Sequence, residues 1–143
     1  MTINIRVLNA EDESWLAKTS TDIFDDPIDL KHAIEFLNDS RHHIVVATEN
    51  DEIVGFVSGV HYVHPDKPNP EFWINEVGVA ETHRAQGIGK SLMNTMLQVA
   101  QDLGCKEAWV LTENDNIPAK NLYKSVSGDE TQDVVMYTFR IGS

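Results

Sequence analysis

Apolar and polar residues alternate along several short stretches of the chain, which is the pattern of strands that bury one face. Residues 2–8 show it first, with Ile3, Ile5 and Val7 on the same side. The same pattern, or a short apolar run, predicts further strands over residues 44–48, 53–62, 72–79, 107–112 and 134–141. Residues 64–70 contain three prolines, so we expect a loop there.

Helical spacing of apolar residues is clearest over residues 87–103, where Ile88, Leu92 and Met96 share one face and Gly104 follows the end. A shorter helix is predicted over 116–125, with a proline in its first turn. Nearer the N-terminus, Asn9 is a candidate helix cap, and Asp26-Pro27 has the composition of a second helix start.

The predicted order is strand, two helices, three strands, helix, strand, helix and strand. This order favours one α/β domain over residues 1–143, of the α+β type, with a mixed, mostly antiparallel sheet and helices on both faces. The 41% of apolar residues suffices for a packed core in a chain of 143 residues.

A net charge of -12 changes the expected partners. It argues against nucleic acid and acidic membranes, and it fits a cationic small molecule or a basic peptide. Cys105 is the only cysteine, and the histidines show no ligand-like spacing, so we expect no disulfide and no metal. Neither a signal peptide nor a membrane span is predicted, and we expect a cytoplasmic protein.

The junction between the strand at 72–79 and the helix at 87–103 is the candidate binding site. Gly87 and Gly89 permit close approach of the backbone to a ligand, and the N-H groups of a helix start attract anions. Arg84 and Lys90 add positive charge, so residues 75–89 suit a pyrophosphate. Position 84 is not the glycine of a Walker loop, and Leu92 replaces the last glycine of a Rossmann fingerprint.

Two motifs carry a family resemblance. Arg84-x-x-Gly87-x-Gly89 resembles the acyl-CoA signature of the GNAT superfamily of N-acetyltransferases, and Asn116-x-x-Ala119-x-x-Leu122-Tyr123 is similar to that family's second helical motif. Asp25-Asp26-Pro27 and the final Val135-Met136-Tyr137 also resemble the aminoglycoside 3-N-acetyltransferases of the gentamicin/fortimicin type. The family's usual Leu-Gly-Phe after the tyrosine is absent here, so we expect a remodelled turn.

The resemblance implies a GNAT-like fold in which the strand at residues 76–79 splays from its neighbour, the strand at 107–112, and it implies acetyl-CoA as cosubstrate. Main-chain groups of Val77 and Val79 would pair with the pantetheine arm, and Asn116 would contact its end. The pyrophosphate would be surrounded by Arg84, Ala85, Gln86, Gly87, Ile88, Gly89 and Lys90.

Acetyl transfer to an amine needs a base for the ammonium and an acid for the thiolate. Glu76 is the candidate base and Tyr123 the candidate acid. Strand alternation points Glu76 away from the face of Val77 and Val79. The candidate residues for binding a cationic acceptor are Asp25, Asp26, Asp29, Glu113 and Asp115.

Three functions stay open. The first is an aminoglycoside acetyltransferase, which would confer antibiotic resistance. The second is an acetyltransferase for another amine, such as a polyamine, an amino acid or a protein amine. The third is a sensor that binds acyl-CoA without turnover. We also expect a homodimer.

Overall fold

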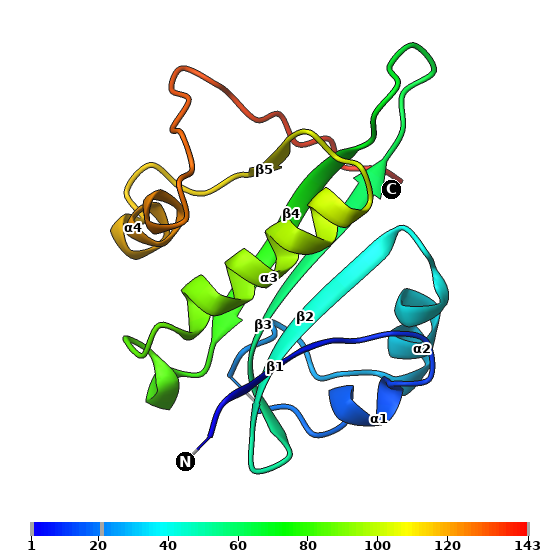
Figure 1. Ribbon diagram of the computed structural model, residues 1–143, viewed down its shortest axis with the longest axis vertical. Coiled ribbons are helices and arrows are strands. Elements are labelled where there is room, and N and C mark those ends of the chain that lie inside the picture. Colours follow the sequence, from blue (N-terminus) through cyan, green and yellow to red (C-terminus); the bar gives the residue numbers. More distant parts are fainter. Residues whose placement is uncertain (1, 21, 143) are drawn as a thin grey trace.

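A single sheet of five strands, in the order β1-β2-β3-β4-β5, forms the centre of the computed structural model, which describes residues 2–20 and 22–142 (Figure 1). The strands are β1 (Asn4–Val7), β2 (His42–Glu49), β3 (Glu52–Tyr62), β4 (Glu71–Val79) and β5 (Ala108–Val110). The first three pairings are antiparallel and the β4–β5 pairing is parallel. The predicted mixed, mostly antiparallel sheet is therefore confirmed.

The helices lie on both faces of the sheet, as predicted (Figure 1). They are α1 (Glu13–Leu16), α2 (Leu30–Asn38), α3 (Ile88–Asp102) and α4 (Ile117–Ser125), with a 3-10 turn at Glu81–His83. On one face, Gly55 of β3 lies against Ile88 and Leu92 of α3. On the other, Phe56 stacks on Phe24, with ring centroids 4.0 Å apart.

The core is apolar on both sides of β2 and β3. The most fully buried large side chains include Val45, Phe56, Phe72, Leu92 and Met96. Burial of a side chain of this size contributes about 1.5–3 kcal/mol to the free energy of unfolding, so the β2–β3 pair anchors the fold. Among the helices of the described residues, none combines the length and the apolar composition that a membrane span requires.

One extra residue interrupts the β3–β4 ladder. Ser58 pairs with Glu76, but the next residue, Gly59, pairs with Ile74, so Asn75 is left as a bulge. A bulge bends its strand and reverses the alternation of side chains beyond it. Because Glu76 is paired with Ser58, the two side chains share the face of Phe56, whereas Val77 and Val79 share the α3 face with Gly55.

The bulge also marks where β4 leaves β5. The two strands pair only between Phe72–Ile74 and Ala108–Val110, whereas β4 continues to Val79. The predicted splay is therefore present, and within residues 2–20 and 22–142 no strand pairs with the second half of β4 on its β5 side. The backbone groups that point to this side are available to a ligand that adopts an extended conformation.

Two helix starts differ from the prediction. Asn9 does not cap a helix, because α1 begins at Glu13, and the Asn9 N-H donates to the Asp12 carboxylate at 2.8 Å. Asp26-Pro27 does not open α2 either. Asp29 is its N-cap, and its carboxylate accepts a hydrogen bond from the Lys31 N-H at 2.9 Å. This cap satisfies an N-H group that the first helical turn would otherwise leave free.

The predicted last strand is wrong for this single chain. Residues 134–141 have no strand partner among the described residues, and their apolar side chains are exposed. The turn after Tyr123 precedes these residues. Ser127 takes the left-handed conformation, with φ of 70°, and the Gly128 N-H donates to the Tyr123 carbonyl at 2.9 Å.

Candidate active site

The loop between β4 and α3 gathers the predicted pyrophosphate residues. Beyond Val79 the chain passes through the 3-10 turn, and α3 begins at Ile88. Ala85 has φ of 62° and Gly87, the N-cap, has φ of 77°. Alternation of left-handed residues with ordinary ones turns successive N-H groups toward one point, and the first turn of α3 adds N-H groups that lack intrahelical acceptors. The loop therefore has the geometry of an anion site.

Side chains from distant segments hold this loop in place. The Asp22 carboxylate accepts a hydrogen bond from the Glu81 N-H at 2.9 Å. His83 Nε2 lies 3.0 Å from the Glu49 carboxylate, and Arg84 Nε donates to the Val79 carbonyl at 3.2 Å. The prediction missed Asp22 and Glu49, because nothing in the local sequence links them to residues 81–83.

The two glycines of the motif have different surroundings. A Cβ atom on Gly87 would meet no atom within 4 Å, so the space beside it is open to a ligand. A Cβ atom on Gly89 would lie 3.3 Å from the Leu122 side chain, so this glycine lets α3 and α4 pack closely. The positive φ of Gly87 also favours glycine, since a Cβ is strained in that conformation.

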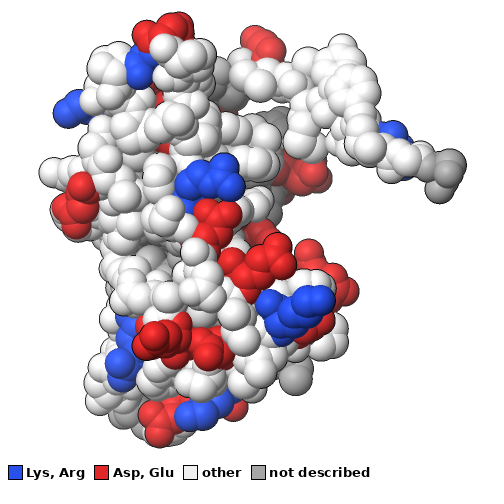
Figure 2. Space-filling model, turned by 90° about the vertical axis from the view of Figure 1, so that its right-hand side faces the viewer, with Lys and Arg blue, Asp and Glu red and all other residues white. Residues whose placement is uncertain are grey.

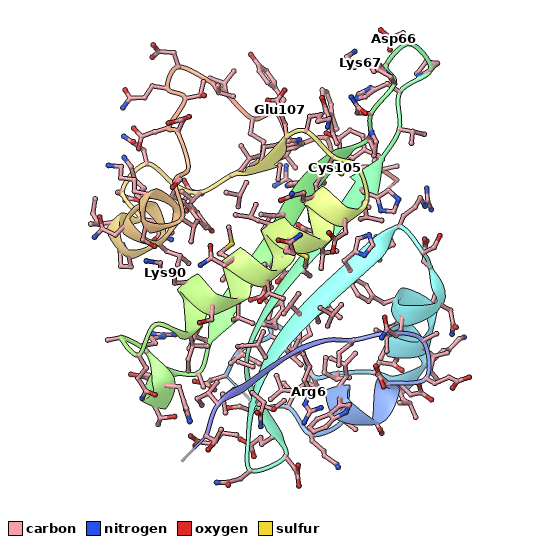
Figure 3. The ribbon with its side chains drawn as sticks, viewed as in Figure 1. Arg6, Asp66, Lys67, Lys90, Cys105 and Glu107 are labelled. Carbon is pink, nitrogen blue, oxygen red and sulfur yellow. The ribbon has the colours of Figure 1, made fainter. Side chains whose placement is uncertain are left out.

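The remaining loop residues supply charge and backbone donors. Arg84, Ala85, Gln86 and Lys90 are exposed, whereas the Ile88 side chain is buried in the core. Figure 3 shows Lys90 on the first turn of α3, on the side where α4 lies. Two exposed cations beside a helix start are well suited to an anionic group. The loop therefore has the charge and the backbone donors that a pyrophosphate site requires.

Glu76 lies on the unpaired half of β4, next to the bulge. Shielding by the surrounding protein, and secondly the charge of Asp25, raise the pKa of its carboxyl group. A carboxylate with a raised pKa holds a proton more readily, which is the property that a general base requires near neutral pH. The structure thus brings Asp25 close enough to influence Glu76.

Tyr123 and Asn116 belong to the second motif, on α4. Tyr123 is half-buried against the core, and this burial raises the pKa of its phenol. Its hydroxyl has no hydrogen-bond partner in the described part of the chain, so it remains able to donate. The Asn116 side-chain oxygen caps α4 by accepting from the Ala119 N-H at 3.1 Å, and its NH2 group can still bind a ligand.

The five candidate acidic residues do not form one cluster. Asp25 and Asp26 lie in the exposed loop before α2, and Asp29 caps that helix and pairs with His32 at 3.5 Å. Glu113 and Asp115 are exposed in the segment that connects β5 to α4. Among the five, Asp25 is the residue whose charge raises the pKa of Glu76.

A polar and aromatic group at the β4–β5 junction was not predicted. Trp73 and Trp109 stack with ring centroids 5.2 Å apart. Trp109 Nε1 donates to the Tyr62 hydroxyl at 2.8 Å, and that hydroxyl donates to Glu71 at 2.9 Å. These contacts fix the point from which the two strands diverge. Sequence offers only a weak signal here, namely aromatic residues in two predicted strands.

Residues 5–128 match the model of the acetyltransferase (GNAT) family. Because this match spans most of the chain, the protein belongs to that family. The family resemblance is confirmed, whereas nothing here specifically supports the 3-N-acetyltransferase type.

Several individual proteins are similar to parts of the chain. N-acetyltransferase 8B of Homo sapiens is 33% identical over 86 residues, 60% of this chain and 38% of that protein. The L-2,4-diaminobutyric acid acetyltransferase of Marinococcus halophilus is 32% identical over 94 residues, 64% of this chain and 52% of that protein. The chain thus spans about half or less of the length of these curated relatives.

Among solved structures, an aminoglycoside acetyltransferase from an uncultured soil metagenomic sample, in complex with sisomicin, has a TM-score of 0.83. It is 22% identical, and the alignment covers 98% of this chain and 97% of that chain. At this identity the likeness shows a common fold.

Proposed function

We propose that this protein is an acetyl-CoA-dependent N-acetyltransferase whose acceptor is the primary amine of a cationic small molecule. The observation that carries the proposal is the divergence of β4 from β5 directly before the anion-binding loop. An extended pantetheine arm can pair with β4 there, through main-chain groups of Val77 and Val79, while the pyrophosphate lies at the start of α3.

The reaction forms a C-N bond and breaks the C-S bond of the thioester. The amine attacks the carbonyl carbon, and the Glu76 carboxylate takes a proton from the nitrogen, directly or through water. The sulfur leaves as a thiolate and takes the proton of the Tyr123 hydroxyl. Both raised pKa values support these roles, since Glu76 can accept a proton and Tyr123 stays protonated near neutral pH.

The acceptor class is inferred from charge. The chain carries a net charge of -12, and Asp25 lies beside the candidate base. A negative surface attracts ammonium groups and raises the rate of encounter. An aminoglycoside is the first candidate acceptor, because the fold is also that of a structure solved with sisomicin. We place the protein in the cytoplasm, where acetyl-CoA is available.

A free diamine is the second candidate acceptor. The relative from Marinococcus halophilus is named for L-2,4-diaminobutyric acid, a small amine that carries a carboxylate. A loss of turnover, which would leave an acyl-CoA sensor, is disfavoured by the presence of both Glu76 and Tyr123.

The test is an assay of thiol release from acetyl-CoA with a panel of amines. The panel contains kanamycin and gentamicin, spermidine, 2,4-diaminobutyrate and a lysine peptide. We expect turnover with at least one cationic amine, and a fall in kcat/KM as salt is raised. Absence of turnover together with tight acetyl-CoA binding would indicate the sensor. Turnover of neutral or anionic amines alone would contradict the electrostatic argument.

A further inference from the structure

Glu49 and His83 form a hydrogen-bonded pair that joins the end of β2 to the 3-10 turn before α3. The Glu49 Oε1 atom lies 3.0 Å from His83 Nε2, and the two side chains are 13% and 18% exposed. Every other pair of an acidic with a basic side chain within residues 2–20 and 22–142 has at least one partner exposed by 30% or more. Because little water reaches this pair, it constrains its two segments more tightly than a surface pair does.

Both nitrogens of the His83 ring have a polar neighbour. An ionised carboxylate only accepts hydrogen bonds, so Nε2 donates to Glu49, and Nδ1 lies 2.8 Å from the Thr82 hydroxyl. The ring therefore cannot turn without the loss of a contact. Because His83 directly precedes Arg84, the fixed ring sets the direction in which the chain enters the anion-binding loop.

The hairpin that carries Glu49 is short and well held. Glu49 pairs with Glu52 across a two-residue turn, in which Asn50 and Asp51 have φ of 51° and 63°. Two successive left-handed residues are typical of the tight turn whose twist matches that of its strands. The strands β2 and β3 are themselves held by the core, so Glu49 has a fixed place at the same end of the sheet as the loop (Figure 1).

Residues 84–87, in contrast, contribute little packing of their own. They are exposed, and the buried core resumes only at Ile88. Ala85 has φ of 62°, a conformation that is strained for a residue with a Cβ and persists only where the surrounding structure holds it. The anion-binding geometry therefore depends on how the two ends of this segment are held.

Accurate placement of the loop matters because the rest of the molecule repels an anion. The net charge is -12, and Figure 2 shows more acidic than basic side chains on the face that it presents. A pyrophosphate is bound only where the backbone N-H groups, Arg84 and Lys90 are directed at it, and their attraction falls as the distance and the angle become less favourable. A small shift of the loop should therefore lower the affinity.

We propose that Glu49 and His83 are a positioning pair for the cofactor, which acts through the loop and not by contact with acetyl-CoA. The pair holds the loop in the conformation that binds the pyrophosphate. Glu49 lies 34 residues before His83 and outside both sequence motifs, so the β2–β3 hairpin supplies a further determinant of cofactor affinity. This inference rests on the proposed function.

Calorimetry with acetyl-CoA tests the pair by a double-mutant cycle. Glu49→Ala and His83→Ala should each raise the dissociation constant about tenfold, and the double variant should raise it no further, because each change removes the same contact. Glu52→Ala is the matched control, since it removes the same charge from the exposed hairpin partner of Glu49, and it should keep the wild-type affinity. A loss of about a hundredfold in the double variant would overturn the proposal.

A second ligand separates positioning from a general loss of structure. S-acetylpantetheine carries the thioester arm but no pyrophosphate, and the amide shifts of Val77 and Val79 in NMR spectra report its binding. We expect wild type and Glu49→Ala to bind it equally. Glu49→Gln, which keeps an oxygen acceptor, should recover most of the acetyl-CoA affinity. Circular dichroism verifies that each variant is folded.

The outcomes distinguish this inference from the proposed function. Equal losses of affinity for both ligands in Glu49→Ala would assign the pair to folding alone. Equal acetyl-CoA affinity in wild type and Glu49→Ala would overturn this inference and leave the proposed function in place. Failure of the wild type to bind acetyl-CoA would overturn both.

Discussion

At the scale of single residues, the charge of Asp25 affects the pKa of the candidate base, Glu76. Asp25 is the second cause of the raised pKa of Glu76. Asp25→Asn removes a negative charge, so we expect the pKa of Glu76 to fall and the acid limb of kcat/KM to move to lower pH. Glu76→Gln should remove this limb and lower kcat about a hundredfold.

The measurement is a pH profile of kcat/KM with one acceptor. Asp26→Asn is a suitable control, because Asp26 is the exposed neighbour of Asp25 in the same loop. An acid limb that stays in place in Asp25→Asn would show that the two carboxylates do not interact during turnover.

Tyr123 offers a second test at this scale. Tyr123→Phe removes the phenol but keeps the half-buried ring, so acetyl-CoA binding should be unchanged. We expect kcat to fall by about tenfold to a hundredfold, since water can protonate the thiolate less efficiently. Calorimetry gives the binding constant and the thiol assay gives kcat. A wild-type kcat would assign the ring to packing alone.

The lowered pKa of His43 should make the stability of the whole chain depend on pH. Burial, and secondly the neighbouring His61 at 2.7 Å, lower the pKa of His43 to about 4. The folded form therefore stays neutral where the unfolded form, with a pKa of about 6.5, takes up a proton. The free energy of unfolding should fall by about 1–2 kcal/mol from pH 7 to pH 5, with allowance for the partial exposure of this group.

Denaturant unfolding at pH 7 and pH 5 measures this difference. His43→Gln should reduce the difference, because the titrating group is gone. His32→Gln is the control, since the His32 side chain is 75% exposed on α2, and it should keep the wild-type difference. Equal pH dependence in all three proteins would mean that other groups cause the loss.

At the scale of elements, the start of α3 depends on the open space beside Gly87. Gly87→Val should raise the acetyl-CoA dissociation constant about tenfold or more, because a branched side chain would fill that space and strain the positive φ. Gly104 follows α3 and has the same two properties, φ of 90° and no atom within 4 Å of a Cβ.

Gly104→Val therefore separates backbone strain from loss of the site. Both variants should lose a similar amount of stability in denaturant unfolding, of about 1–2 kcal/mol. Only Gly87→Val should lose acetyl-CoA affinity in calorimetry. Equal affinity in both variants would place the pyrophosphate elsewhere.

The long elements were predictable because their signals are local and repeated. Ile88, Leu92 and Met96 define one face of α3, and their burial confirms it. The start of α2 was not predictable, because Asp26 and Asp29 are both good caps and only the packing of Ala33 and Leu37 decides between them. Asn75 carries no signal of a bulge, since the β3 register creates it.

The motifs predicted which residues gather in the loop, but not how the loop is held. Asp22 and Glu49 reach it from far along the chain. The prediction of a last strand failed for a related reason. The alternating residues at 134–141 are typical of a strand, but a local pattern carries no information about which sheet edge could pair with it.

At the scale of the whole molecule, acetyl-CoA should stabilise the fold, because it bridges β4, the loop and α3. At 100 times its dissociation constant it adds about 2.7 kcal/mol, which raises the Tm by roughly 8 °C in a chain of this size. A thermal scan with acetyl-CoA, ATP and NAD tests this. A shift with ATP or NAD but not with acetyl-CoA would contradict the proposed function.

The inserted residue at position 75 has a consequence for any comparison along β4. A single inserted residue reverses which face of the sheet each side chain occupies on one side of the insertion relative to the other. A relative that shares the glycine motif but lacks the insertion would still present the residue equivalent to Glu76 to the same layer, because the count from Glu76 to Arg84 does not cross position 75. Its residues before the bulge would face the layers opposite to those that Trp73 and Ile74 face here. Residues in that half of the strand are therefore best equated by the face of the sheet they occupy, not by their count from the glycine motif.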